Sequence, residues 1–268
     1  MKVAILAGGM GTRLSEETIT RPKPMVEIGG RPILWHIMKI YAHYGFHEFI
    51  IALGYKGDVI KRYFLDFPYI ESSCLTIEQV NRVSTPKVFL NNYRDTFLSI
   101  KVHLLETGLP TQTGGRVRQL LEFAKEPIML TYGDGVANID INELLEFHQD
   151  MEKLVTLTAV RPPSRFGTVS YLEGSSTIES FTEKPISSLY AGNSINGGFM
   201  VLEPEILKYF DDEDCNFEKE ILPKIAADHQ LVGFNHEGFW HCMDTMRDVQ
   251  HLNELWDAGN AEWKVWND

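Results

Sequence analysis

Short, continuously apolar runs alternate with amphipathic segments along the first 160 residues of the chain. A continuous apolar run is typical of a strand buried on both faces, whereas apolar residues that recur every three or four positions are typical of a helix with one buried face. In residues 32–45, Ile33, Ile37 and Ile40 form such a helical stripe. The pattern predicts strands at 3–6, 48–54, 128–135 and 154–160, and helices at 32–45, 57–66, 116–125 and 140–151.

Buried strands that alternate with helices indicate an α/β fold, with a mostly parallel, Rossmann-like sheet flanked by helices and joined by right-handed crossovers. Two stretches, 75–107 and 165–202, consist of extended segments with no helix between them, and we interpret them as β-rich additions. Helices are predicted again at 218–228 and 246–259. Because no repeat, low-complexity tract or linker-like change of composition interrupts the chain, we expect residues 1–268 to form a single domain.

Composition adds a broad class to this picture. Hydrophobic residues make up 44% of the chain and charged residues 23%, which is ordinary for a soluble globular protein. No apolar run approaches the roughly 20 residues of a membrane span, and the N-terminal apolar segment is too short and too rich in glycine for a signal peptide. Cys74, Cys215 and Cys242 are widely separated, so no disulfide framework is indicated. We therefore expect a cytoplasmic protein that binds no membrane.

The formal net charge of −12 argues against a nucleic-acid-binding protein, which requires a basic face. It does not argue against an anionic small substrate, because a local field can differ in sign from the net charge. Arg13, Arg21 and Lys23 place three cations in the loop that follows the first predicted strand.

That loop lies within the sequence AILAGGMGTRLSEETITRPKPM, at residues 4–25. It is not a phosphate-binding P-loop, because Thr12 and Arg13 stand where that motif has Lys and Ser or Thr. It is not a dinucleotide-binding fingerprint either, because Leu14 occupies the third glycine position. The glycine-rich turn therefore needs another explanation.

The turn follows a strand, and open α/β sheets bind their ligands beyond the carboxyl ends of their strands. Gly8, Gly9 and Gly11 allow the backbone to approach a ligand closely, and successive amides in such a turn form an anion-binding nest. Arg13 and Lys23 add positive charge, and the prolines beside Lys23 stiffen its backbone. These features favour a polyphosphate site; the alternative is a glycine-rich connection that carries solvated cations.

The same stretch resembles the signature of the sugar-phosphate nucleotidyltransferases, L-x-G-G-x-G-T-R-L followed by P-K-P. Further segments are similar to this family: TGGRVRQL, TYGDGVANID, RFGTV, FTEKP, INGGFMVLEPEI and GFWHCMDTMRD. The resemblance covers nearly the whole chain except about 68–106, and it is closest to the cytidylyl branch. It implies the nucleotide-diphospho-sugar transferase fold and a Mg²⁺-dependent enzyme whose substrates are CTP and glucose 1-phosphate.

The resemblance also implies roles for individual residues. It makes Arg13 and Lys23 catalytic residues that neutralise the phosphates of the nucleotide. It places Lys184 at the sugar phosphate, which suits a compact ammonium, although the same segment could be a solvated strand end. The implied nucleotide-binding residues are Leu6, Ala7, Gly8, Gly9, Gly11, Thr12, Arg13, Lys23, Arg116, Tyr132 and Gly133, and the implied sugar-phosphate-binding residues are Gly167, Glu183, Lys184 and Asn196.

Two aspartates are candidates for a magnesium site. Asp134 lies between two glycines at the end of a predicted strand, at the same sheet edge as the opening loop. Carboxylate oxygens are the hard ligands that Mg²⁺ prefers, although Asp and Gly are also common in simple turns. The resemblance implies that Asp134 and Asp244 both hold Mg²⁺; by its own position, Asp244 would be the N-cap of the following helix.

Other polar residues have simpler interpretations. Arg116 could be an exposed residue at a helix start rather than a nucleotide ligand. The histidines near Cys242, His236 and His241, have no spacing that fits a closed zinc site, and we interpret them, like His36, as packing or surface residues.

Two alternatives to the implied activity stay open at this point. One is the same reaction with UTP, dTTP or another phosphorylated acceptor, because spacing does not reveal base specificity. The other is a regulatory domain that binds a nucleotide or a sugar without turnover, although the presence of Lys23 and Asp134 argues against it.

The extended segments in 75–107 predict assembly, since open edge strands are usually covered or paired. Pairing with a neighbouring subunit would build a closed homo-oligomer, and the resemblance implies a hexamer. The same interface could bring Arg116 to a neighbour's site. The alternative is a monomer in which these segments fold back on their own chain.

Overall fold

A seven-stranded sheet forms the centre of the protein, in the order β14-β10-β13-β8-β1-β4-β7. The computed structural model describes residues 1–11, 14–78, 87–93, 100–161, 168–172, 174–182 and 194–267. Strand β13 runs antiparallel to both of its neighbours, and the other neighbouring strands pair in parallel. The strands are β1 (Lys2–Leu6), β4 (Glu48–Leu53), β7 (Lys101–Glu106), β8 (Ile128–Tyr132), β10 (Val155–Val160), β13 (Ile195–Leu202) and β14 (Leu231–His236).

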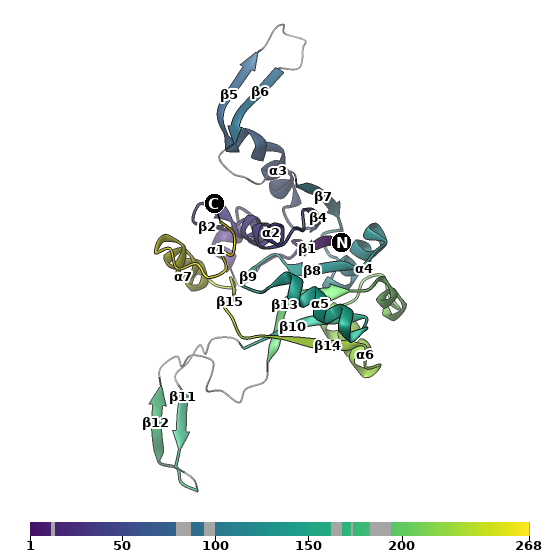
Figure 1. The fold of residues 1–268 in the computed structure, drawn as a ribbon, viewed down its shortest axis with the longest axis vertical. Helices are drawn as coiled ribbons and strands as arrows, with labels where there is room; N and C mark the ends of the chain where they lie inside the picture. Colours follow the sequence, from purple (N-terminus) through teal and green to yellow (C-terminus); the bar gives the residue numbers. More distant parts are fainter. Residues whose placement is uncertain are drawn as a thin grey trace.

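Helices cover both faces of the sheet (Figure 1). Because successive strand residues point to opposite faces, Val3 and Ile5 pack on the side of α2, α5 and α7, whereas Ala4 packs on the side of α4 and α6. This arrangement confirms the predicted α/β class, with a mixed, mostly parallel sheet between helices. The helices are α1 (Ser15–Thr18), α2 (Ile33–His43), α3 (Gly57–Glu71), α4 (Thr113–Ala124), α5 (Ile141–Met151), α6 (Leu222–Ala227) and α7 (Met246–Asp257).

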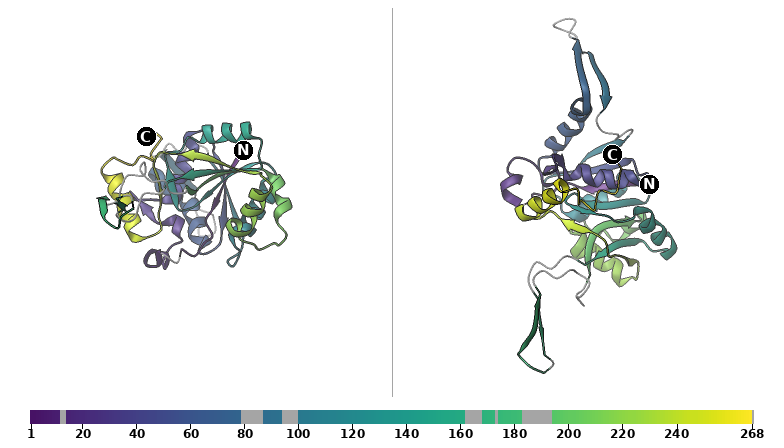
Figure 2. Two further views of the ribbon diagram at one scale, coloured as in Figure 1. Left: turned by 90° about the horizontal axis from the view of Figure 1, so that it is seen from below. Right: turned by 60° about the vertical axis from the view of Figure 1, so that its left-hand side comes forward.

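Two hairpins extend from opposite ends of this body, as Figures 1 and 2 show. The first consists of β5 (Ser72–Glu78) and β6 (Lys87–Tyr93), and the second of β11 (Thr168–Tyr171) and β12 (Ile178–Thr182). The second hairpin lies within the predicted β-rich stretch 165–202, whereas the first begins at Ser72, before the predicted stretch 75–107.

The prediction was wrong for the last part of each stretch. Strand β7 pairs in parallel with β4 at the edge of the central sheet, and β13 lies between β10 and β8 in its middle. The period of two that marks a strand says nothing about which other strand it pairs with. Pairing is a long-range property, so these strands could not be assigned to the sheet from their own residues.

The C-terminal part also differs from the prediction. Between the two expected helices lie β14 and the short strand β15 (Trp240–Cys242), which pairs with β9 (Gly135–Ala137). Strand β14 is an edge strand whose side chains are half-buried or exposed, so its apolar pattern is weak. The first of the two helices begins as a π-helical turn, Phe217–Ile221, before α6.

A cluster of aromatic residues joins α2 to the C-terminal segment. His36 is fully buried there, with its ring 4.7 Å from that of Trp256. Its Nε2 lies 2.9 Å from the carbonyl oxygen of Ile28, and its Nδ1 lies 3.3 Å from the indole Nε1 of Trp263. Since the carbonyl accepts and the indole donates, the ring is a neutral tautomer with its proton on Nε2. His36 is thus a packing residue, as predicted.

Burial lowers the pKa of His36 from 6.5 to about 4. Between these values the unfolded chain binds a proton that the folded chain excludes, so stability falls as the pH falls through this window. We expect the free energy of unfolding to drop by about 2 kcal/mol from this group between pH 7 and pH 5. Chemical denaturation at both pH values should show a smaller drop for His36→Gln than for the wild type.

A matched control is His43→Gln, at an exposed position on the same helix. This variant should show the same drop in the free energy of unfolding as the wild type, because it leaves the buried His36 ring and its hydrogen bonds unchanged. Equal drops in the wild type and in His36→Gln would contradict the assignment.

Candidate functional site

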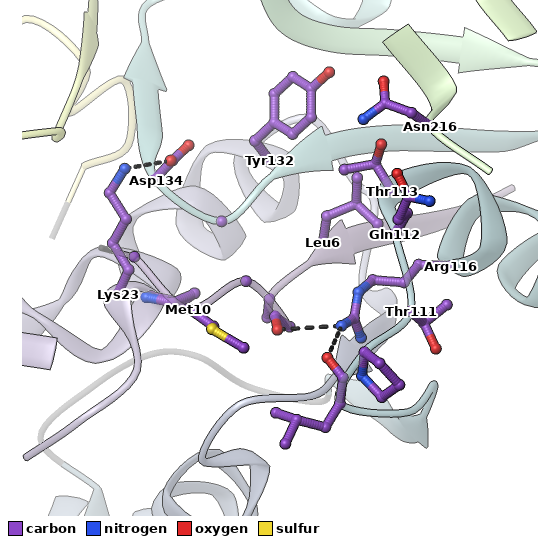
Figure 3. Close-up of a pocket in the computed structure, with 18 residues that line it drawn as sticks. Leu6, Met10, Lys23, Thr111, Gln112, Thr113, Arg116, Tyr132, Asp134 and Asn216 are labelled. Atoms are coloured by element: carbon purple, nitrogen blue, oxygen red, sulfur yellow. Dashed lines mark hydrogen bonds and ion pairs between the residues drawn. The ribbon is translucent and has the colours of Figure 1, made fainter. Parts of the chain in front are cut away.

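Loops from several strands meet at one edge of the sheet and surround a cavity of about 500 Å³ (Figure 3). Strands β1, β4, β7 and β8 run in parallel, so the segments that follow them emerge on the same side. Ten of the residues expected at a nucleotide and metal site line this cavity, together with eight that were not expected. The lining residues are Leu6, Ala7, Gly8, Gly9, Met10, Gly11, Lys23, Pro24, Leu109, Pro110, Thr111, Gln112, Thr113, Arg116, Tyr132, Gly133, Asp134 and Asn216.

The glycine-rich turn is fixed on one side and open on the other. The carbonyl oxygen of Gly8 accepts hydrogen bonds from the Tyr55 amide at 3.2 Å and from Arg116 Nη2 at 3.2 Å. A Cβ atom on Gly8 would collide with the Arg116 guanidinium, and one on Gly54 would collide with the Gly8 carbonyl. A Cβ atom on Gly9 would meet nothing within 4 Å. The turn therefore has a rigid base and leaves space for a ligand above Gly9.

Arg116 supports the glycine-rich turn from the side opposite the cavity opening at Gly9. Its side chain reaches from α4 beneath the turn, and the residue is only 4% exposed. Nη1 donates to the Leu53 carbonyl oxygen at 2.9 Å and to Thr107 Oγ1, and Nη2 also donates to the Leu109 carbonyl oxygen at 3.4 Å. One guanidinium thus ties together the segments that follow β1, β4 and β7. Burial lowers the pKa of Arg116, against an opposing attraction by Asp214.

These contacts correct two expectations for Arg116. The residue is not an exposed helix start, because its guanidinium is buried against backbone carbonyls. It also lines the cavity of its own chain, so no neighbouring subunit is needed to give it a site. The sequence could not show this, since the acceptors Gly8 and Leu53 come from distant segments.

Lys23 and Asp134 lie at the other side of the cavity from Arg116 (Figure 3). Together with Asp244 they form a cluster in which Lys23 and Asp244 are buried and Asp134 is half-buried. Lys23 Nζ lies 2.6 Å from Asp134 Oδ2 and 2.6 Å from Asp244 Oδ1. Burial disfavours the charged ammonium, but the attraction of Asp134 and the hydrogen bonds to both aspartates outweigh it and raise the pKa of Lys23. The two carboxylates thus enclose a cation in this structure.

The small β9–β15 sheet brings the two aspartates together. Cys242 pairs with Gly135, and the Met243 amide donates to the Asp134 carbonyl oxygen at 2.8 Å. This pairing sets Asp134 and Asp244 side by side, although they follow different strands. Asp244 was expected as a helix N-cap from its position alone, and that alternative is wrong because Thr245 is the N-cap of α7.

Asp248 fixes the backbone of Asp244. Its Oδ2 accepts hydrogen bonds from the Asp244 amide at 3.0 Å and from the Thr245 amide at 2.7 Å, in a capping box at the start of α7. Its Oδ1 lies 3.2 Å from His241 Nε2. Hydrogen bonds to Thr245 and Asp244 outweigh the effect of burial and lower the pKa of Asp248. His241 therefore contacts the carboxylate of the helix-capping Asp248, which is a structural role of the kind predicted for it.

The donor atoms of this cluster suit a divalent cation. One oxygen each from Asp134 and Asp244 and the sulfur of Cys242 all lie within 4.8 Å of one another. Carboxylate oxygens are ligands for hard cations, and the Lys23 ammonium already stands where a positive charge is stabilised. The residues present thus fit a bound cation, with Asp134 and Asp244 as its oxygen ligands.

A second polar network lies beside the cavity, around Tyr132. Its hydroxyl donates to Glu218 Oε1 at 2.6 Å and accepts from Asn196 Nδ2 at 3.3 Å. Thr113 Oγ1 donates to the other oxygen of Glu218 at 2.6 Å. Burial and then the negative charge of Glu218 raise the pKa of Tyr132, so that it stays a hydrogen-bond donor. The network joins β8, β13 and α4 across the rim of the site.

Several of these residues were not expected from the sequence. Glu218 lies in a short helical segment with no motif of its own. Residues 109–113 line the cavity, and the run of Thr, Gly and Pro at 107–111 before a helix is a loop signal. That signal would have pointed to the site only if β7 had been recognised as part of the central sheet.

Five expected site residues lie outside the described part of the chain: Thr12, Arg13, Gly167, Glu183 and Lys184. Asn196, the remaining expected sugar-side residue, lies at the start of β13 and contacts Tyr132. Among the described residues, the helices are all too short or too polar to cross a membrane.

The family model described as "Nucleotidyl transferase" matches residues 2–264. The chain therefore belongs to the nucleotidyl transferase family, which confirms the resemblance seen in its motifs. It is 45% identical to "Glucose-1-phosphate cytidylyltransferase" of Salmonella typhimurium, over 99% of this chain and 100% of that protein. It is 43% identical to "Probable glucose-1-phosphate cytidylyltransferase" of Bacillus subtilis, again over 99% and 100% of the two chains.

Solved structures share the fold. HddC from Yersinia pseudotuberculosis, crystallised in a complex with GMP-PN, matches with a TM-score of 0.66 and 22% identity, covering 95% of this chain and 99% of that one. At this level of identity the comparison supports the fold alone.

Proposed function

We propose that this protein is a glucose-1-phosphate cytidylyltransferase, which condenses CTP with glucose 1-phosphate to form CDP-glucose and pyrophosphate. The observation that carries the proposal is the cavity between the glycine-rich turn and the Lys23–Asp134–Asp244 cluster. Such a cavity offers backbone amides and cations to a polyphosphate on one side and carboxylates to a metal on the other. The full-length relatives at 43% and 45% identity carry this name, which supports the choice of substrates.

In this reaction a phosphate oxygen of glucose 1-phosphate attacks the α-phosphorus of CTP, and the bond to the β-phosphate breaks as pyrophosphate leaves. No covalent intermediate with the protein is needed, so positioning and charge neutralisation supply the catalysis. We assign the glycine-rich turn to binding of the nucleotide and its phosphates. Arg13 is assigned to the leaving pyrophosphate, and Lys23 to the charge that grows around the α-phosphate.

Asp134 and Asp244 are the residues that would hold Mg²⁺. A bound Mg²⁺ would orient the phosphates and reduce the repulsion between the two anionic substrates. Asp248 positions Asp244 for this role through the capping box. Arg116 keeps the glycine-rich turn in its ligand-ready shape through its hydrogen bond to the Gly8 carbonyl.

The acceptor site is assigned to Glu183 and Lys184, with Gly167 and Asn196 beside them. Lys184 would hold the sugar phosphate and Glu183 the sugar hydroxyls. Asn196 connects this side to the nucleotide side, because its amide donates to the Tyr132 hydroxyl, which in turn donates to Glu218.

A panel of nucleoside triphosphates tests the proposal. With glucose 1-phosphate and Mg²⁺ present, CTP should release pyrophosphate with a kcat/KM at least about 100-fold above UTP or dTTP, because the site must recognise the amino group of cytosine. Mass spectrometry should identify the product as CDP-glucose. Equal or faster turnover of UTP or dTTP would favour the alternative nucleotide, and binding without any pyrophosphate release would favour a sensing domain.

We also propose that the protein is a homo-oligomer, and the family resemblance implies a hexamer. The two hairpins extend away from the central body in Figures 1 and 2, which supports a role in assembly. Light scattering at micromolar concentration measures this directly, since a mass of 30.6 kDa corresponds to one chain and would refute assembly.

A further inference from the structure

The Lys23 ammonium occupies the space that a cation between Asp134 and Asp244 would need. Its Nζ lies 2.6 Å from an oxygen of each carboxylate, and those carboxylate groups are the ones assigned to the metal. The side chains of Lys23 and Asp244 are each only 10% exposed, so water does little to loosen the contact. In this structure the Lys23 ammonium therefore supplies the positive charge between the two carboxylates.

An ammonium and a divalent cation cannot share this space. Mg²⁺ binds oxygen at about 2.0–2.1 Å, so a Mg²⁺ held by Asp134 Oδ2 and Asp244 Oδ1 would take the place that Nζ now occupies. The Lys23 ammonium and a divalent cation would both be positively charged at this site. Because little water reaches the site to weaken their interaction, they would repel each other strongly. Entry of the cation therefore requires the Lys23 side chain to turn away.

When the Lys23 ammonium moves away from the two aspartates, it needs another anion as its partner. A buried charge without a partner is costly, and the cost favours the present pairing as long as no other anion is near. Lys23 lines the cavity that also contains the glycine-rich turn. The phosphates of a bound nucleotide would lie in that cavity under the proposed function and would offer the ammonium a new partner.

We propose that Lys23 is a gate that couples cation binding to nucleotide binding. Without a nucleotide, its ammonium holds both carboxylates and competes with the metal. With a nucleotide, the phosphates attract the ammonium, and Asp134 and Asp244 become available to the cation. This inference rests on the proposed function for the metal site, and it adds that a single lysine sets the affinity of the nucleotide-free protein for metal.

The test measures Mn²⁺ binding to the nucleotide-free protein by electron paramagnetic resonance and by titration calorimetry. Lys23→Met removes the competing charge and keeps the length of the side chain. We expect this variant to bind Mn²⁺ at least about tenfold more tightly than the wild type. Lys23→Arg keeps a cation at the position and should bind Mn²⁺ no more tightly than the wild type.

A second lysine provides the matched control. Lys2 pairs with Glu126 at 2.5 Å on another part of the protein, so Lys2→Met removes the ammonium of a lysine–carboxylate ion pair without touching the site. Its Mn²⁺ affinity should equal that of the wild type. Circular dichroism of each variant verifies the fold, and Lys23→Gln serves as a second neutral substitution.

The outcomes separate the gate from the metal site itself. Tighter binding in Lys23→Met that is lost again in the Lys23→Met, Asp244→Asn double variant supports the gate. Equal or weaker binding in both neutral variants, with wild-type binding that is lost in Asp134→Asn, overturns the gate and leaves the metal site intact. Binding that survives Asp134→Asn and Asp244→Asn overturns both the gate and the proposed metal site.

Discussion

Replacing Asp134 by Asn is expected to lower kcat by at least about 100-fold while the protein stays folded. The substitution keeps the volume of the side chain and removes the charge that would hold a divalent cation at the phosphates. The Lys23–Asp244 ion pair, with its distance of 2.6 Å, remains to hold the loop in place. Steady-state kinetics with CTP and glucose 1-phosphate, together with circular dichroism, measure both parts of the expectation.

Removal of the metal should lower the activity just as replacement of the Asp134 carboxylate does. Chelation by EDTA is expected to abolish CDP-glucose formation in the wild type, and added Mg²⁺ should restore it. Asp150→Asn is a matched control at an exposed position on α5 and should keep full activity. Full activity in chelator, or an Asp134→Asn variant with more than half of the wild-type kcat, would reject the two-aspartate site.

Replacing Arg116 by Met is expected to lower the free energy of unfolding by about 3 kcal/mol. The guanidinium donates to the Leu53, Gly8 and Leu109 carbonyl oxygens and to Thr107 Oγ1, and a thioether would remove all of these hydrogen bonds in a buried place. The Gly8 carbonyl would keep only the Tyr55 amide as a donor, and the Leu53 carbonyl would keep only Thr107. The glycine-rich turn would also lose its base, so the KM for CTP should rise. Urea denaturation and steady-state kinetics measure the two effects.

Arg118→Met is the control for this substitution. Arg118 lies two positions further along the same helix, and its ion pair with Glu122 at 2.9 Å is partly exposed. Its loss should change the stability by less than about 0.5 kcal/mol. In the proposed oligomer Arg116 would reach the turn of its own chain, so mixing Arg116→Ala chains with Lys23→Ala chains should give no more activity than the sum of the two variants measured separately. Recovered activity after verified subunit exchange would contradict this reading of the structure.

Local features of the site were predictable because neighbouring residues produce them. The glycine-rich turn after a buried strand, the cations that follow it and the Asp-Gly turn after another strand all depend on a few adjacent positions. The parallel order of the first strands follows from their alternation with helices, which places both turns at one edge of the sheet. Family motifs then gave these residues their expected roles.

Contacts between distant segments needed the tertiary structure. Lys23 and Asp244 are 221 positions apart, and they meet only because β15 pairs with β9 beside Asp134. Arg116 was placed near the phosphates from its motif, but its contacts with the Gly8 and Leu53 carbonyls show that it holds the turn from below. Neither contact can be predicted from the pattern of hydrophobic and polar residues in the segments that make it.

The sequence by itself determined the α/β class, the glycine-rich turn and the identity of most residues around the cavity, because periodicity and turn chemistry are short-range properties. The tertiary structure decided that β7 and β13 belong to the central sheet, that residues 109–113 line the cavity, and that Lys23 lies between two carboxylates. Strand pairing and buried ion pairs depend on which segments meet when the chain collapses, and that is settled by packing and charge compensation across the whole molecule rather than by any single stretch of it.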